Sequence, residues 1–93
     1  MQNNISNELL PIQRNIRHIE SKAANKAIVI CYSDRAVAEQ AINHLEKLNA
    51  KLGIDRVEYV FSGTNFNVIP YFNHQFEFEE FNNALNPTHY LVA

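Results

Sequence analysis

Cysteine, glycine, proline and tryptophan are scarce in this chain of 93 residues, which has one cysteine, two glycines, three prolines and no tryptophan. One cysteine excludes a disulfide within the chain, and the low glycine and proline content argues against extensive disorder. No apolar run is long enough to span a bilayer, since the longest covers residues 27–32. The first residues lack the basic start and apolar core of a secretory signal. We therefore expect a cytoplasmic protein.

A surplus of positive charge is also missing. The chain has eight Lys and Arg residues and ten Asp and Glu residues, so its formal net charge is -2. Proteins that bind nucleic acid usually carry an excess of Lys and Arg that meets the phosphate backbone, and we do not expect such a partner here. What the chain has instead is a hydrophobic fraction of 46%. That composition predicts one packed domain spanning residues 1–93.

The most regular hydrophobic pattern lies in residues 1–25. Apolar residues recur there at steps of four and three, as on one side of a helix, and they are Ile5, Leu9, Ile12, Ile16, Ile19 and Ala23. The pattern predicts an amphipathic helix that starts or kinks near Pro11, because proline lacks an amide donor. Two interpretations stay open: the helix covers its own domain, or it pairs with a second copy in a homodimer. The residues of that dimer contact would be Leu9, Ile12, Ile16 and Ile19.

Residues 27–53 predict a strand followed by a helix. The strand at 27–32 is apolar on both faces, which is typical of a strand buried on two sides. Ser33 and Asp34 can cap the start of a helix, because their side-chain oxygens accept hydrogen bonds from its first free amides. The helix is expected to reach about residue 52, and Gly53 can end it in the left-handed conformation.

The rest of the chain predicts a hairpin, a short helix and a last strand. Residues 54–61 and 66–72 flank a turn cluster, and Pro70 is expected to bulge or end the second strand. With a final strand at 89–92, residues 26–93 have the order βαββαβ. We therefore predict an α+β, ferredoxin-like domain with a four-stranded antiparallel sheet, preceded by the N-terminal amphipathic helix. Because both core helices would lie on one face, the other face needs a cover, either that helix or another molecule.

No catalytic, metal or nucleotide-binding motif rises above background. Cys31 directly precedes a helix start, where a thiol can be activated, but it has no second cysteine for a redox pair and is expected to pack in the core. His18, His44, His74 and His89 have no metal-ligand spacing, so we expect neither a metal nor another cofactor. Of the four, His74 is the strongest candidate for a functional histidine, since it lies in a loop before a helix.

Aromatic residues crowd the hairpin and the short helix after it. RNA-recognition motif domains stack bases on aromatics of such a sheet, but residues 65–70 lack the basic-glycine-aromatic opening of that motif. Aromatic anchors beside a polar rim are also typical of protein-binding surfaces. The predicted contact surface consists of Tyr59, Phe61, Phe66, Asn67, Tyr71, His74, Glu77, Glu79 and Glu80.

These patterns favour a small non-enzymatic protein that binds a larger protein or protein complex and inhibits or assists it. In size and expected fold the chain is similar to phage-encoded anti-defence proteins, anti-CRISPR proteins among them, and to toxin-immunity proteins. Two other classes stay open. One is a dimeric ligand-sensing module of the ACT kind, although the glycine-bearing loop after the first strand is absent. The other is a small dimeric α/β-barrel enzyme with His74 or His89 facing a pocket beside Tyr32 and Tyr71.

Overall fold

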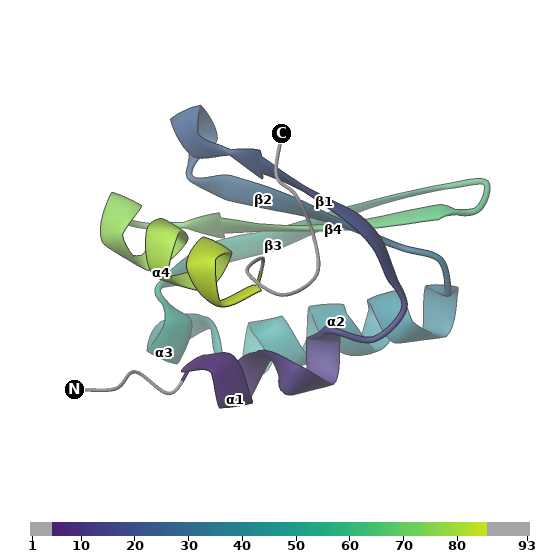
Figure 1. The fold of residues 1–93 in the computed structure, drawn as a ribbon, viewed down its shortest axis with the longest axis horizontal. Coiled ribbons are helices and arrows are strands. Elements are labelled where there is room, and N and C mark those ends of the chain that lie inside the picture. Colours follow the sequence, from purple (N-terminus) through teal and green to yellow (C-terminus); the bar gives the residue numbers. More distant parts are fainter. Residues whose placement is uncertain (1–4, 86–93) are drawn as a thin grey trace.

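The fold is a four-stranded antiparallel sheet with helices, seen in a computed structural model that describes residues 5–85 (Figure 1). The strand order in the sheet is β1-β2-β4-β3. In chain order the elements are α1 (Ile5–Leu9), the 3-10 turn η1 (Leu10–Ile12), β1 (Ile16–Lys22), the 3-10 turn η2 (Ala23–Asn25), β2 (Ala27–Tyr32), α2 (Arg35–Lys47), α3 (Asn49–Leu52), β3 (Ile54–Ser62), β4 (Asn65–Phe72) and α4 (Gln75–Leu85). The predicted α+β class and four-stranded antiparallel sheet are confirmed.

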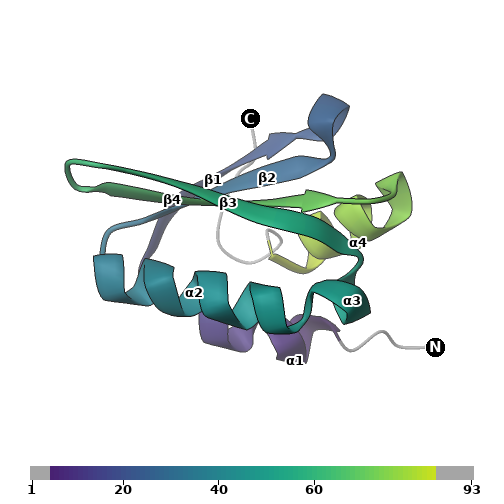
Figure 2. The same ribbon diagram turned by 180° about the vertical axis from the view of Figure 1, so that it is seen from behind.

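The α-helices lie on one side of the sheet, as the two opposite views in Figures 1 and 2 show. The hydrophobic core fills the space between these helices and the sheet, and its largest fully buried side chains include Tyr32, Phe81, Leu9, Ile12 and Ile28. The other side of the sheet, which we call the open face, has no helix over it among residues 5–85. Within the same residues, no helix combines the length and the apolar character needed to cross a membrane.

The strand and the terminating glycine predicted for residues 27–53 are confirmed, whereas the single helix predicted between them is divided at Leu48 into α2 and α3. β2 is buried on both faces, and only Val29 is partly exposed. Asp34 caps α2, since its side chain accepts hydrogen bonds from the amides of Ala36 and Val37 at 2.8 and 3.3 Å. Gly53 ends the helical segment with a φ of 74°, a conformation that other residues adopt only with strain.

The prediction of one helix over the N-terminal segment is wrong. The structure has a short α1 and the turn η1, and then residues 16–22 form β1, an edge strand paired antiparallel with β2. Pro11 lies in η1, where a missing amide donor costs little. Asn15, with a φ of 58°, then turns the chain into the sheet. The apolar pattern predicted a helix and did not indicate that residues 16–22 could pair with the edge of β2 through backbone hydrogen bonds.

A bulge explains why the pattern was misleading. Ile16 lies opposite Tyr32, and Ile19 lies opposite Ile30, so both isoleucines face the helices although they are three residues apart. In a regular strand this spacing would place them on opposite faces. The register shift between Ile16 and His18 adds one residue and restores the common side. Apolar residues spaced three apart therefore lie on one side of a bulged strand, just as they would lie on one side of a helix.

The predicted hairpin is confirmed as β3 and β4, and a register shift lies beside Pro70, where Ile54 pairs with Phe72 and Arg56 pairs with Tyr71. β4 continues to Phe72, and Pro70 pairs with Val57 of β3 while lying fully buried. On its other side, β4 pairs with β2 at Ala27 and at Ile30, with no regular pair between them in the described strands. The missing amide donor of proline thus weakens the ladder with β2 and leaves the hairpin intact.

The expected order βαββαβ differs from the described one, which begins with two strands. The edge position beside β2 is occupied by β1, a strand that precedes it in the chain. The last predicted strand, residues 89–92, lies outside the described residues. The N-terminal segment also does not cover the open face, because α1 and η1 pack on the same side of the sheet as α2 and α4 (Figure 2).

Candidate functional site

Three aromatic rings of the hairpin form a continuous row. The ring centroids of Tyr59 and Phe61 are 5.1 Å apart, and those of Phe61 and Phe66 are 5.3 Å apart in an edge-to-face arrangement. The register of the sheet places all three on its helix-covered side, where Tyr59 lies opposite Val68 and Phe61 lies opposite Phe66. Phe61 and Phe66 are half-buried against the core, whereas Tyr59 is 59% exposed. The row therefore begins in the core and ends in solvent.

The exposed end of this row lines a groove between β3 and α2. The groove has a volume of about 300 Å³ and is lined by Arg35, Glu39, Ile42, Asn43, Tyr59 and Phe61, and we call it the aromatic groove. Its lining combines apolar and polar side chains, and the polar part is the larger. The guanidinium of Arg35 lies 5.4 Å from the centre of the Phe61 ring and forms an ion pair with Glu39 at 3.0 Å. Apolar lining residues beside polar groups can hold a side chain of another molecule.

The four α2 residues of this groove were not among the predicted site residues. Arg35, Glu39 and Ile42 follow one another at steps of four and three, so they form a stripe along one side of the helix. The helix pattern by itself gave no reason to separate this stripe from the rest of the solvent-facing surface. Only the packing of α2 against the sheet places it beside β3.

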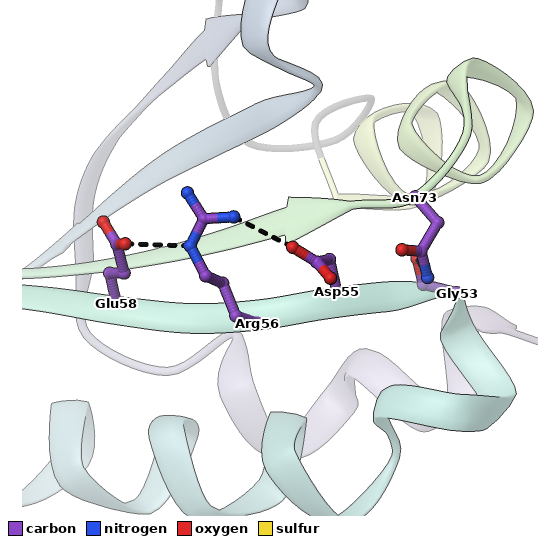
Figure 3. Close-up of polar contacts among 5 residues, drawn as sticks. All are labelled: Gly53, Asp55, Arg56, Glu58 and Asn73. Atoms are coloured by element: carbon purple, nitrogen blue, oxygen red, sulfur yellow. Dashed lines mark hydrogen bonds and ion pairs between the residues drawn. The ribbon is translucent and has the colours of Figure 1, made fainter.

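The open face of β3 carries a compact group of charges. Arg56 donates from Nε to Glu58 and from Nη1 to Asp55, both at 2.9 Å, and its guanidinium lies 3.9 Å from the centre of the Tyr71 ring. Figure 3 shows these three charged side chains on the side of β3 that faces away from α2. The group has a net charge of -1, from two carboxylates and one guanidinium.

This charge group changes the acidity of its members. The hydrogen bond from Arg56 lowers the pKa of Glu58 below its ordinary value; desolvation opposes this with a smaller effect, and Tyr71 lowers the pKa further. The hydrogen bonds to Glu58 and then to Asp55 raise the pKa of Arg56. Both side chains are exposed to solvent, so these interactions are screened by salt and stabilise the fold only weakly.

The other predicted contact residues lie in two separate places. Asn67 and Tyr71 point to the open face, because they pair with Cys31 and Ala27 on alternate positions of β2. His74 lies exposed just before α4, and its carbonyl accepts the amide of Phe78. Glu79 is exposed, and Glu80 is half-buried. The structure thus divides the predicted surface among the aromatic groove, the open face and the start of α4.

Glu77 is not the free surface carboxylate that the sequence pattern suggested. It packs against the turn at Gly53, where a Cβ would lie 2.5 Å from Cγ of Glu77. Its Oε1 is buried and has no hydrogen-bond partner within residues 5–85. Asn73 fixes the same turn from the end of β4, since its backbone amide and its side-chain amide both donate to the carbonyl of Gly53 (Figure 3).

The proposed dimer residues are used within the chain. Leu9 and Ile12 are fully buried, Ile19 is 3% exposed, and Ile16 is half-buried against the same core. The hydroxyl of Tyr32 donates to the carbonyl of Ile12 and anchors the N-terminal segment to β2. This burial matches the interpretation in which the apolar stripe covers its own domain. The homodimer stays a prediction.

The pocket expected for an enzyme of the α/β-barrel type is not formed by the described residues. Tyr32 lies in the core on the helix-covered side, whereas Tyr71 lies on the open face, and His89 lies outside the described residues. Cys31 is buried, as expected for core packing, and its thiol lies 3.7 Å from Oδ1 of Asn65. Within residues 5–85, no three His, Cys, Asp or Glu side chains lie close enough together to hold a metal ion.

A second hollow, of about 390 Å³, lies between η1 and α2 and was not predicted. It is lined by Pro11, Arg14, Gln40, Asn43, His44 and Lys47. The positive charge of Lys47 has a structural explanation, because Lys47 lies in the last turn of α2 and complements the helix dipole. Arg14 donates to Gln40 at 2.9 Å, and His44 contacts the carbonyl of Glu8 at 2.6 Å. These contacts hold the N-terminal segment against α2.

Comparisons of the chain with models of protein families, with curated proteins and with solved structures find no match. The aromatic groove and the adjoining edge of β3 are therefore the features from which a function can be inferred.

Proposed function

We propose that this chain is a cytoplasmic, non-enzymatic protein that binds a larger protein or protein complex and inhibits or assists it, with the aromatic groove as its main contact. The observation that supports this proposal is the exposure of Tyr59. Tyr59 is 59% exposed and the neighbouring Val60 is 54% exposed, so one strand presents large apolar side chains on both of its faces. Exposed apolar residues that cluster beside a polar rim are typical of protein-binding surfaces.

The chemistry of the groove fits the anchors that dominate protein interfaces. Tyrosine and arginine are enriched among the few residues that carry most of the binding free energy. Tyr59 and Arg35 both contact the Phe61 ring, which favours the conformations in which they line the groove. Such preorganisation reduces the entropy lost on binding.

The wider surface includes the remaining predicted residues. Asn67 and Tyr71 lie on the open face of β4, which adjoins β3, and His74, Glu79 and Glu80 lie at the start of α4. A partner that covers all three regions would have to wrap around the β3 edge. In its narrower form the proposal is a phage-encoded anti-defence protein, similar to anti-CRISPR proteins, or a toxin-immunity protein. The identity of the partner would decide between an anti-defence protein and a toxin-immunity protein.

The fold that accompanies this proposal is a ferredoxin-like arrangement in which β1 takes the edge beside β2. Three features support it. α2 connects β2 to β3, the hairpin of β3 and β4 follows, and β4 returns to lie beside β2 with α4 after it. These elements reproduce the order strand, helix, strand, strand, helix of the expected domain.

The test compares capture of a partner by three forms of the chain. Tagged wild type, Tyr59→Ala and Leu10→Ala are incubated with lysate of the native host, and the bound proteins are identified by mass spectrometry. Leu10 is the matched control, because it is an exposed apolar residue, 60% exposed, in η1 and outside the proposed contact surface. We expect a stoichiometric partner with wild type and Leu10→Ala, and a loss of affinity of about 30-fold with Tyr59→Ala. Equal capture by Tyr59→Ala would contradict the proposed surface.

The acidic part of the surface has its own test. Glu79→Lys combined with Glu80→Lys reverses two charges at the start of α4, while the aromatic groove stays intact. If this region contacts the partner, the affinity and its dependence on salt should both change. An unchanged affinity at low and high salt would remove α4 from the contact surface and leave the groove.

A further inference from the structure

We propose that β3 accepts an extended segment of the partner as an added strand, and that this segment alternates apolar and basic side chains. This inference rests on the proposed function, since it describes how the partner would occupy the aromatic groove. The recognition would combine main-chain hydrogen bonds along β3 with side-chain contacts in the groove.

The first support is the position of β3 at the edge of the sheet. β3 pairs only with β4, and among residues 5–85 no other element forms a hydrogen bond with its backbone. From Arg56 to Ser62 the pairing with β4 is regular, with one partner for each residue. Half of the backbone N–H and C=O groups along these seven residues therefore point outward and can bind another strand.

The second edge of the sheet is less suited to this role. β1 carries a bulge between Ile16 and His18 in its pairing with β2, and Lys22 and Arg17 are exposed on it. Bulges and positively charged side chains are the common means by which proteins protect an edge strand. The regular part of β3 has neither a bulge nor a proline, and its one cation, Arg56, forms ion pairs with Asp55 and Glu58.

The third support is the alignment of the aromatic groove with this edge. Val57, Tyr59 and Phe61 alternate along β3 toward α2, and Arg35 and Glu39 lie along the facing side of α2. A strand added beside β3 would direct every second side chain into the space between β3 and α2. Apolar side chains at these positions would contact Tyr59, Phe61 and Ile42.

The fourth support is the charge on the other face. There the added strand would pass Asp55, Arg56 and Glu58, whose net charge is -1 and whose single cation already binds both carboxylates. Opposite charges across neighbouring strands stabilise the pairing, and like charges oppose it. Basic side chains at the alternate positions of the partner segment are therefore favoured.

The same charges disfavour one of the registers in which a second copy of β3 could pair with the first. If two β3 strands paired antiparallel over their full length, from residue 54 to residue 62, the centre of the pairing would be residue 58. Glu58 would then lie opposite Glu58 of the second copy, and two like charges would face each other. A segment with lysine or arginine at this position has no such conflict.

The test uses a blocked octapeptide that alternates valine and lysine, added to the isotope-labelled full chain and followed by NMR. We expect shifts confined to Arg56–Ser62 and to the α2 residues of the groove, with slower exchange of alternate β3 amides. A peptide that alternates valine and glutamate should bind about tenfold more weakly. Shifts that appear elsewhere, or equal binding of the two peptides, would overturn the proposal.

Methylated peptides identify strand addition specifically. A strand that joins a sheet donates toward its neighbour from every second residue only. Methylating the backbone amides of one residue type, either all valines or all lysines, should therefore abolish binding. Methylating those of the other type should leave binding largely intact. If both methylated peptides bind equally, the contact is not an added strand.

The outcomes separate this inference from the proposed function. If wild type captures a partner and Tyr59→Ala does not, but neither alternating peptide binds β3, the proposed function stands and strand addition is overturned. If the valine-lysine peptide binds β3 with the expected methylation pattern while no partner is captured through Tyr59, the proposed function fails instead. If the chain alone forms a concentration-dependent dimer with the same β3 shifts, the edge belongs to a second copy and the inference is wrong.

Discussion

Gly53 and Glu77 approach so closely that a Cβ on Gly53 would lie 2.5 Å from Cγ of Glu77. Gly53 ends α3 with a φ of 74°, and Glu77 belongs to the first turn of α4, so this contact joins two ends of helices across the start of β3. The carbonyl of Gly53 also accepts two hydrogen bonds from Asn73 (Figure 3). Gly53 thus contacts both the end of β4 and the first turn of α4.

Replacing Gly53 by alanine should destabilise the fold by about 2 kcal/mol, because the new Cβ adds a steric conflict to the strain of the positive φ. Gly63→Ala is the matched control. Gly63 lies in the turn of the hairpin with a φ of 59°, and a Cβ added there would have no other atom within 4 Å. Gly63→Ala should lower the free energy of unfolding by only about 1 kcal/mol. The measurement is urea unfolding. Adding Glu77→Ala to Gly53→Ala should restore the stability that Gly53→Ala loses beyond the loss in Gly63→Ala. Equal losses for the two glycine variants would exclude the steric effect of Glu77.

Ile12→Ala should lower the free energy of unfolding by about 2–4 kcal/mol, because Ile12 is fully buried in the core of its own chain. Leu10 is the matched control, since it is two residues away and 60% exposed, and Leu10→Ala should change stability by less than about 0.5 kcal/mol. Light scattering on the same samples tests the homodimer. A wild-type dimer that Ile12→Ala converts into an equally stable monomer would show that the stripe is an interface between subunits.

Tyr32→Phe should cost about 1–2 kcal/mol, because the substitution removes the buried hydroxyl that donates to the carbonyl of Ile12 and leaves that carbonyl unsatisfied. Tyr59→Phe removes a hydroxyl from an exposed side chain and should be close to neutral. Chemical denaturation measures both effects. A neutral Tyr32→Phe would mean that the N-terminal segment is held by packing alone.

Glu58 should titrate below its ordinary pKa of 4.5, because the hydrogen bond from Arg56 favours the carboxylate. The stabilisation from this pair is then fully present above pH 4.5 and is lost as the pH falls through the lower pKa of the folded state. An NMR titration of the side-chain carboxyl carbon measures this pKa. Arg56→Gln should return it toward the ordinary value, and so should salt at about 0.5 M, because both side chains are exposed. A pKa that Arg56→Gln leaves unchanged would contradict the assigned cause.

Local patterns predicted much of the fold. The apolar segment before Asp34 became β2, the capped helix became α2, and the turn cluster after residue 61 became the turn of the hairpin. In each case the residues that form the sequence pattern lie within a few residues of the structure that they produce. A cap binds the first amides of its own helix, and a turn joins two strands that are adjacent in the chain.

The candidate site was predicted only in part, because it joins elements that are distant in the sequence. The aromatic residues of the hairpin were identified from their density, and Tyr59, Phe61 and Phe66 do form one row of rings. The pattern did not indicate that Asn67 and Tyr71 would face the opposite side, although strand alternation requires it. The α2 residues that line the groove had no sequence pattern that marked them as part of a site.

The sequence by itself determined the α+β class, the β2–α2 unit and the hairpin, because short-range hydrogen bonding and the alternation of apolar residues encode them locally. Only the tertiary structure decided that residues 16–22 form a strand, that they occupy the edge beside β2, and that β3 is the other edge of the sheet within residues 5–85. The physical reason is that a spacing of three residues fits a helix as well as a bulged strand. The choice between them depends on which backbone groups of β2 are left to be satisfied.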